Sequence, residues 1–337
     1  MQDISKIVER TLVPHTAFEI AVRRLEQCFQ KADGASEPVC IAVVGESRTG
    51  KSRVLEECSS RHSSQRGPEG LAMPVLGVET PAKPTVKGLV TLMLREVGDP
   101  LYWAGTEMAK TIRLRALMRN TGTRMVIIDE FQHFYDKGTD KVIHAVADWL
   151  KVLVDKCKVA LVVAGLPSCR AVLDQNEQLA GRFLAPIIMP RFNWQVDDER
   201  EEFIGILGAF TQSLRTQFDV PELDCDEMAF RIYCATGGLM GYLTKLLRQA
   251  VWNAVDEERG SISLADLARA HEDALWSPAV LPNLPRPFDG GFNLGPSEDL
   301  LQKIRRLGTP TEPVQETVPR NLPRARSPRI GEVLCAS

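Results

Sequence analysis

Short blocks of uninterrupted apolar residues recur through the first 200 positions of the chain. Three of them span residues 39–44, 123–131 and 158–167, and a shorter one spans 185–192. Continuous apolarity, in place of strict alternation, is typical of strands that are buried on both faces of a parallel sheet. The three longer blocks therefore predict interior strands, with helices on both sides of the sheet, and residues 185–192 predict a short last strand.

A fifth strand is predicted at residues 72–80, where Pro74 and Gly77 interrupt the apolar residues. Proline has no N–H group to donate to a neighbouring strand, so a strand that contains it belongs at the edge of a sheet. We therefore expect this strand to lie outermost.

Between the strands the apolar positions follow a helical period. In residues 17–31 they fall on one helix face, at Phe18, Ala21, Val22, Leu25 and Phe29. Further helices are predicted at 53–61, 85–97, 106–119 and 138–156, whereas residues 1–16 and the polar, glycine-rich residues 59–71 are predicted to be irregular. Strands that alternate with helices predict the α/β fold class.

After about residue 195 the chain shows helical periods only. They span residues 197–216, 224–235, 240–257 and 263–275, and they predict a small all-helical domain. From Pro278 onward proline and glycine are frequent, which predicts a mostly disordered tail. One amphipathic stretch, residues 297–307, begins with serine and two acids, a typical helix start. We interpret it as a docking helix for a partner.

The sequence GESRTGKS, residues 45–52, directly follows the first predicted strand and precedes a predicted helix. Its spacing is G-x-x-x-x-G-K-[ST], the P-loop pattern, met by Gly45, Gly50, Lys51 and Ser52. Glycines let consecutive backbone amides turn toward a phosphate chain, and the helix N-terminus adds partial positive charge. Lys51 is expected to reach the β- and γ-phosphates, and Ser52 to bind Mg²⁺. The alternative is a glycine turn with a chance lysine, which the flanking strand and helix disfavour.

Two acidic residues, Asp129 and Glu130, end the apolar block at 123–131. In a P-loop protein, an acid at the carboxyl end of a buried strand is the Walker B position. Asp129 would hold Mg²⁺, directly or through water, and Glu130 would orient and polarise the attacking water. Ligands of open parallel sheets lie beyond the carboxyl ends of the strands, so both motifs share one rim. His133 is interpreted as a polar strand-end residue in preference to a sensor of nucleotide or partner.

These features divide the chain into four parts. They are an N-terminal segment and helix, 1–37; an α/β nucleotide-binding domain, 38–195; a helical domain, 196–277; and a flexible tail, 278–337, with its short helix at 297–307. The predicted nucleotide site falls within the second part.

Composition changes this picture little. The 337 residues are 44% apolar and 25% charged, and the net charge of −3 argues against wholesale coating of nucleic acid while allowing a local basic face. The eight cysteines form no C-x-x-C pair, so we interpret them as buried small hydrophobes in a reducing cytoplasm. No apolar run reaches 18 residues and the first ten residues show no signal-peptide core, so no membrane span is expected.

The series of motifs resembles the AAA+ ATPases of transposons called TniB or TnsC, which are related to the IstB/DnaC and origin-initiator ATPases. The resemblance covers about residues 10–275 and is carried, in order, by GESRTGKS, IIDEFQHF, VVAGLPSC, LAGRF and ATGGLMGYLTKLLRQA. It implies an AAA+ core with a five-stranded parallel sheet and a helical lid. It also implies ATP and Mg²⁺ as cofactors, and ATP-driven assembly of this chain into rings or filaments around duplex DNA.

The partners implied by the resemblance are a TniQ-type target selector and a DDE transposase of the TniA/TnsB type. The assembly is expected to link the two, and ATP hydrolysis is expected to disassemble it. Two other functions stay open. One is a helicase-loader-like ATPase with a replicative helicase as partner, and the other is a non-hydrolysing DNA scaffold in which ATP is only a structural ligand.

Carried over position by position, the resemblance assigns Arg182, in LAGRF, to an arginine finger that acts in a neighbouring subunit. Without the resemblance, a solvated surface arginine is the simpler interpretation. Val13 and His15 match a stretch that packs near adenine, with a simple core turn as an equal alternative. The expected nucleotide contacts are Val13, His15, Gly45, Glu46, Ser47, Arg48, Thr49, Gly50, Lys51, Ser52, Arg53 and Asp129, with Ser52 and Asp129 on the metal and Lys51, Glu130 and Arg182 as the catalytic residues.

The resemblance places DNA contacts on the helix after the edge strand and on the loop before the next helix. Lys87 and Thr106 occupy the matching positions. Such residues would touch phosphates, which position a duplex without reading its sequence. The alternative for both is a solvated amphipathic helix face.

Two positions depart from the family pattern. Leu166 stands at the sensor 1 position, which is usually polar, and Tyr242 stands at the sensor 2 position, which is often arginine. Either Ser168 substitutes for the first or that sensor is weak, and Lys245 or Arg248 would have to reach back for the second. Both departures predict slow hydrolysis, which fits a regulator that uses ATP as a timer.

Overall fold

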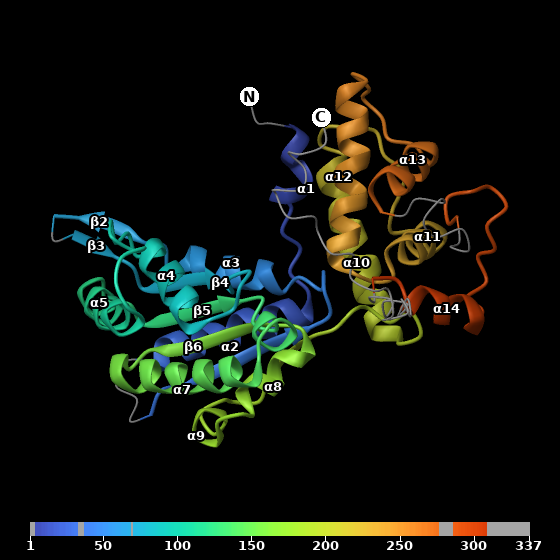
Figure 1. Ribbon diagram of the computed structural model, residues 1–337. Helices are drawn as coiled ribbons and strands as arrows, with labels where there is room; N and C mark the ends of the chain where they lie inside the picture. Colours follow the sequence, from blue (N-terminus) through green and yellow to red (C-terminus); the bar gives the residue numbers. More distant parts are fainter. Residues whose placement is uncertain (1–3, 33–36, 69, 276–285, 309–337) are drawn as a thin grey trace, which may run out of the picture. The chain divides into compact units, whose positions relative to one another are not determined.

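The computed structural model describes residues 4–32, 37–68, 70–275 and 286–308. Its central feature is a five-stranded sheet with parallel pairings throughout, in the order β4-β5-β6-β1-β7 (Figure 1). The strands are β1 (Cys40–Gly45), β4 (Val75–Glu79), β5 (Met125–Asp129), β6 (Ala160–Gly165) and β7 (Ile187–Met189). The predicted α/β fold class and the five-stranded parallel sheet are confirmed.

Strand β4 lies at one edge of the sheet, as Pro74 predicted. Pro74 stands just before the strand, and its carbonyl accepts hydrogen bonds from the N–H groups of Arg124 and Met125 at 2.9 and 3.1 Å. Buried and more exposed residues alternate along β4, whereas β1 and β6 are buried at every position. The three longer apolar blocks form β1, β5 and β6, which are interior strands because helices cover both of their faces. The shorter block forms β7, which is the other edge of the sheet, and Ile188 in it is exposed.

Alternate strand residues enter two apolar cores on opposite faces of the sheet. On one face Ile41, Val43 and Val162 pack with two helices, α2 (Thr16–Lys31) and α3 (Lys51–Arg61). On the other face Ala42 and Val163 pack with α4 (Val86–Glu96), α5 (Glu107–Asn120), α7 (Asp140–Cys157), α8 (Arg170–Leu173) and α9 (Glu177–Ala180). The result is a three-layer core whose strands all end at one rim.

Two segments that were expected to be irregular contain short elements. After α3 an antiparallel pair forms, β2 (Gln65–Gly67) with β3 (Gly70–Ala72). Near the N-terminus η1 (Ile4–Lys6) and α1 (Ile7–Arg10) form, and Val8 is buried. Both expectations are wrong for one reason, because elements of three or four residues are too short to show a period.

Four helices form the predicted helical domain, which we call the lid: α10 (Asp197–Leu214), α11 (Asp226–Thr236), α12 (Met240–Asp256) and α13 (Leu264–Ala274). They share one apolar core, which Phe203, Tyr233 and Leu247 help to fill. Glycines at 237 and 238 both have positive φ and end α11. None of the helices in the described ranges combines the length and the apolar character needed to cross a membrane.

The short helix expected inside the tail is present as α14 (Glu298–Arg305). Ser297 caps it, and Leu301 and Ile304 are buried in the apolar core of the lid. The apolar face that was interpreted as a docking surface for a partner is therefore covered by this chain itself. Residues 286–296 of the predicted tail are also ordered, since Phe288 is buried in the lid core and Arg231 donates to the carbonyl oxygen of Asp289 at 3.1 Å, so the expectation of disorder is wrong there. Residues 278–285 and 309–337 lie outside the described residues.

Candidate nucleotide site

The P-loop connects the carboxyl end of β1 to the first turn of α3. Gly50 has a φ of 98°, in the left-handed region that glycine adopts without strain, and Arg48 also has a positive φ of 68°. At Gly45 an added Cβ would lie 2.3 Å from the carbonyl oxygen of Met189, so only glycine lets β7 approach. Both glycines of the motif are thus required by the local backbone, independently of any ligand.

Lys51 points into the loop that precedes it. Its Nζ donates hydrogen bonds to the carbonyl oxygens of Gly45 and Glu46, at 3.0 and 2.6 Å, and only 6% of the residue is exposed. Burial lowers the pKa of Lys51, while Glu130 and Asp129 oppose that shift. The ammonium group is therefore held where phosphate oxygens would replace the loop carbonyls as its acceptors.

The two expected magnesium ligands are brought together by the fold. The Ser52 hydroxyl donates a hydrogen bond to Oδ2 of Asp129 at 2.8 Å, joining the start of α3 to the end of β5. A hydroxyl and a carboxylate oxygen are hard donors of the kind Mg²⁺ takes when phosphates complete its shell. The donor chemistry of these two residues therefore fits the metal.

The end of β5 is tied to the edge strand beside it. Both the N–H group and the hydroxyl of Thr80 donate to the carbonyl oxygen of Asp129, at 3.0 and 2.9 Å. In the side chain of Asp129, the carboxylate oxygen Oδ1 accepts a hydrogen bond from the N–H group of Glu130 at 2.7 Å. The backbone of Glu130 has a φ of 53°, an uncommon conformation for a residue other than glycine. The chain thus turns sharply after the Walker B acids.

Gln132 is a member of this rim that the sequence analysis missed. It is 4% exposed, and its Nε2 donates to Oε2 of Glu130 at 2.5 Å. His133 lies farther away, with its Nε2 3.8 Å from the same oxygen. No spacing rule marks a glutamine two positions after an acid, so this role becomes visible only from the fold.

The lid contacts the P-loop through the start of α12. The N–H group of Gly241 donates to the carbonyl oxygen of Arg48 at 2.8 Å, and the Arg48 guanidinium lies 4.8 Å from the centre of the Tyr242 ring. Arg48 also contributes to lowering the pKa of Lys245, after burial as the main cause. Arg248 is paired with Glu9 at 3.7 Å. Arg248 is thus engaged by the N-terminal segment, and a contact of either basic residue with nucleotide stays a prediction.

Arg191 is a second residue that the sequence analysis missed. Its Nε lies 3.1 and 3.2 Å from the carboxylate oxygens of Glu46 in the P-loop. Its terminal nitrogens donate to the carbonyl oxygens of Gly237, at 3.4 Å, and Leu307, at 2.9 Å. One arginine after β7 thus joins the P-loop, the end of α11 and the segment after α14.

Arg182 follows α9 and does not contact the rim of its own chain. Its Nη2 is 2.8 Å from Oδ1 of Asp155 on α7, and its side chain is 19% exposed. A role in a neighbouring subunit would require Arg182 to exchange Asp155 for a phosphate. The finger assignment stays a prediction.

Val13 and His15 lie where the chain enters α2. His15 is the N-cap of that helix, with Nδ1 accepting from the N–H group of Phe18 at 3.4 Å, and its ring lies edge-on to Phe192 at 5.4 Å. Burial lowers the pKa of His15 and favours the neutral form that this cap requires. The core turn that was considered for this stretch accounts for His15, and the contact with adenine stays a prediction.

The two predicted DNA residues lie at helix N-termini and are exposed. Lys87 is in the first turn of α4, and Thr106 caps α5 by accepting from the N–H group of Ala109 at 3.3 Å. Thr106 therefore has a structural role whether or not DNA binds. In the first turns of α5 a charged residue is buried and an apolar residue is exposed, the reverse of the usual arrangement. Lys110 is 2% exposed and Met108 is 75% exposed.

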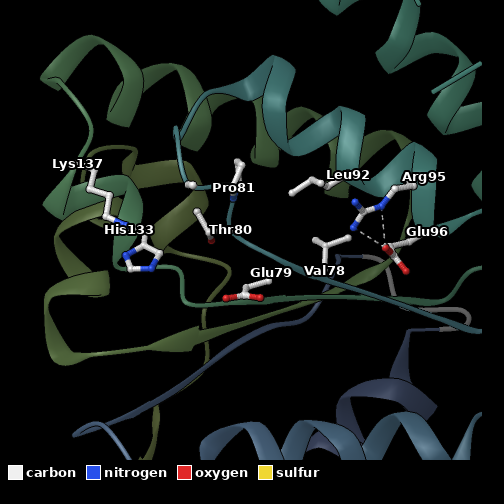
Figure 2. Close-up of a pocket in the computed structure, with 10 residues that line it drawn as sticks. Val78, Glu79, Thr80, Pro81, Leu92, Arg95, Glu96, His133 and Lys137 are labelled. Carbon is white, nitrogen blue, oxygen red and sulfur yellow. Dashed lines mark hydrogen bonds and ion pairs between the residues drawn. The ribbon is translucent and has the colours of Figure 1, made fainter. Parts of the chain in front are cut away.

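A cavity of about 360 Å³ lies beside the rim and is lined in part by the segment that leads from β4 to α4. Figure 2 shows the side chains that line it. Glu79, Thr80, His133 and Lys137 line it, together with the ion pair of Arg95 and Glu96 at 3.1 Å. Lys51 and Ser52 do not line this cavity. It is a neighbour of the phosphate site and not the site itself.

Fold and rim together define a P-loop nucleotide-binding domain of the AAA+ type with a helical lid. The model of the bacterial TniB protein family matches residues 3–194, and the chain belongs to this family. The resemblance stated from the motifs is thereby confirmed. Among curated proteins no match is found.

Solved structures with the same fold include Cdc6p and ORC proteins. Cdc6p from Pyrobaculum aerophilum is similar with a TM-score of 0.60 and 15% identity, over 83% of this chain and 74% of that one. The ORC2 protein of Aeropyrum pernix in ADPNP-ADP complexes has a TM-score of 0.58 and 14% identity, over 80% and 71%. The ORC1 protein of Aeropyrum pernix in complex with DNA has a TM-score of 0.55 and 14% identity, over 81% and 71%. At these identities the likeness is one of fold.

Proposed function

We propose that this protein is an ATPase that regulates DNA transposition by assembling on duplex DNA. The observation that carries the proposal is the hydrogen bond of 2.8 Å between Ser52 and Asp129, with Lys51 inside the P-loop and Glu130 next in sequence. These four residues supply the phosphate, metal and water contacts of an ATPase at one rim. Membership of the TniB family supports transposition as the process.

Each rim residue has a separate task in this proposal. Lys51 and the P-loop amides bind the β- and γ-phosphates, and Glu130 accepts a hydrogen bond from the attacking water and draws off its proton. Ser52 and Asp129 would hold Mg²⁺, which when bound offsets the negative charge of the phosphates. The apolar Leu166 and the aromatic Tyr242 at the sensor positions favour a slow reaction, suited to timing how long an assembly lasts.

The place of Arg182 supports the proposed oligomerisation. A positive charge near the γ-phosphate accelerates phosphoryl transfer, and Arg182 does not contact its own P-loop residues in the described structure. In a head-to-tail assembly it would lie against the nucleotide of the next subunit, with Asp155 released. ATP would then sit between subunits, and its hydrolysis would weaken the assembly.

The segment of α4 and α5 is the proposed DNA face. Residues 83–119 carry seven basic and three acidic side chains, although the chain as a whole has a net charge of −3. Lys87 and Lys83 are exposed there, and phosphate contacts need only exposed cations. We propose further that the assembly on DNA links a TniQ-type target selector to a DDE transposase.

Electron microscopy of the full chain with duplex DNA, with and without a slowly hydrolysed ATP analogue, tests this function. We expect rings or filaments only when DNA and the analogue are both present, and we expect Lys51→Ala to prevent them. Monomers under every condition would refute assembly on DNA. Capture of a replicative helicase in place of a DDE transposase by the assembled protein would favour the helicase-loader alternative.

A further inference from the structure

The buried amide of Gln132 connects the ends of two neighbouring strands. Its Nε2 donates to Oε2 of Glu130 at 2.5 Å, after β5, and its Oε1 accepts from the N–H group of Leu166 at 3.1 Å, after β6. Gln132 is 4% exposed, whereas the side chain of its acceptor Glu130 is 38% exposed, so a buried amide holds a carboxylate that solvent can reach. An amide placed in this way can satisfy a carboxylate and a backbone donor at once.

The surrounding backbone is shaped to admit this side chain. At Gly165 an added Cβ would lie 2.3 Å from Oε1 of Gln132, so a larger residue there would displace the amide. The N–H group of Phe131 donates to the carbonyl oxygen of Ala164 at 2.9 Å and holds the turn after β5 against the end of β6. Gly165 and this backbone bond together keep the Gln132 amide in one place.

This arrangement accounts for the apolar residue at the sensor 1 position. Leu166 has no polar side chain to offer the rim, but its backbone N–H group is engaged by Gln132. A polar link between the end of β6 and Glu130 is therefore present. Its side chain, Gln132, comes from the segment after β5 and not from the segment after β6. Nε2 of His133 lies 3.8 Å from Oε2 of Glu130, beyond hydrogen-bond distance.

We propose that Gln132 is the positioning residue for Glu130 in ATP hydrolysis, an inference that rests on the proposed ATPase function. By donating to Oε2 it orients the carboxylate and leaves Oε1 to accept the proton of the attacking water. The same amide is hydrogen-bonded to Leu166 after β6 and to Glu130, so a movement of the end of β6 would also move the Glu130 carboxylate. Gln132 itself touches neither water nor phosphate in this role.

The first test compares Gln132→Leu with the wild type in single-turnover hydrolysis of ATP in the presence of duplex DNA. A misplaced base costs up to about 100-fold in rate, so we expect a loss of about 10- to 100-fold. Binding of a fluorescent ATP analogue should change by less than about threefold, because Lys51 and the P-loop are intact. The matched control is Gln175→Leu on an exposed glutamine, which should leave rate and binding unchanged.

A double-mutant cycle separates positioning from a merely structural role. In a Glu130→Gln background, adding Gln132→Leu should slow hydrolysis no further, because the residue that Gln132 orients is already inactive. An additional loss of the same size in that background, or a parallel loss of ATP-analogue binding, would overturn the proposal. Faster hydrolysis by Gln132→Leu alone would also overturn it, because Gln132 would then be restraining Glu130.

If Gln132→Leu is unstable, Gln132→Glu tests the positioning role of Gln132 independently. The new carboxyl group would face the carboxylate of Glu130 at hydrogen-bond distance, and two such groups share one proton. Because that proton can sit on either group, the fraction of Glu130 able to act as a base depends on pH in a way that the wild type lacks, so the pH profile of activity should differ in shape from that of the wild type. A pH profile parallel to that of the wild type would contradict the positioning role.

The failure of this inference is distinguishable from failure of the proposed function. If the wild type hydrolyses no ATP with DNA present, the ATPase function itself is wrong. If the wild type hydrolyses ATP and Gln132→Leu matches it in rate, only the role of Gln132 is wrong.

Discussion

The rim of the sheet and the face of α4 and α5 are built in opposite ways. At the rim, polar side chains engage one another, with Ser52 on Asp129, Gln132 on Glu130 and Lys51 on the loop carbonyls. On the α4–α5 face, the predicted DNA residues Lys87 and Thr106 are exposed. One region needs exact geometry for chemistry, and the other needs only cations at a surface.

This difference teaches how each region should respond to substitution. Changes among contacting residues couple strongly, whereas changes at separate exposed positions add. Loss of one rim residue should therefore impair a step by at least about 10-fold. Loss of one surface cation should weaken binding by a small and uniform increment.

The most extensive effect is expected for Lys51→Ala, because nucleotide binding precedes both hydrolysis and assembly. Its buried ammonium has no substitute in the P-loop, so affinity for a fluorescent ATP analogue should fall about 100-fold or more, given the strength of hydrogen bonds between charged groups. Equilibrium titration measures this, with Lys141→Ala on an exposed lysine of α7 as control. Unchanged affinity would mean that nucleotide binds elsewhere.

Glu130→Gln should keep ATP binding and remove turnover. Loss of a general base costs about 1,000-fold in rate, within the usual range for such residues. Steady-state phosphate release measures this loss. Glu79→Gln is the matched control, because Glu79 lies on the edge strand β4 and pairs in register with Asp129 of β5. If both variants lost the same amount of turnover, the effect would come from removing a negative charge near the rim and not from removing a general base.

Arg182→Ala should slow hydrolysis by about 100-fold, as expected for removal of one group that stabilises developing charge. Mixing it with an equal amount of Glu130→Gln should restore roughly a quarter of the wild-type rate, because random head-to-tail pairing joins an intact Glu130 to a neighbour's intact Arg182. Phosphate release by the mixture checks this. If the mixture is no faster than Arg182→Ala alone, Arg182 does not act in a neighbouring subunit, and its role is the ion pair with Asp155.

The smallest effect is expected for Lys87→Ala on DNA binding. Loss of one phosphate contact should flatten the log–log dependence of affinity on salt by about 0.9. Fluorescence anisotropy with duplex DNA over a range of salt measures the slope, and Lys156→Ala on α7 is the control. An unchanged slope would move the DNA face away from α4.

The sequence predicted those parts of the site that follow from a local pattern. The P-loop and the Walker B acids were visible from spacing and from the strands beside them, and Pro74 placed the edge strand, because each depends on neighbours in the chain. Gln132 and Arg191 were not visible. Their roles depend on contacts with Leu166 and Glu46, which are 34 and 145 positions away.

The same reasoning explains why α14 was found as a helix but interpreted wrongly as an open docking surface. Its capping serine and its amphipathic period are local signals. The partner of its apolar face is the lid core, which the fold assembles from distant helices. An amphipathic pattern shows that a face will be covered and does not show by what.

The most direct test of the account is ATP turnover by the full chain over a range of protein concentrations, with and without duplex DNA. The account predicts slow turnover that requires Glu130, that increases with DNA, and that rises more steeply than in proportion to protein concentration, because Arg182 acts between subunits. Turnover per subunit that is independent of both concentration and DNA would contradict it.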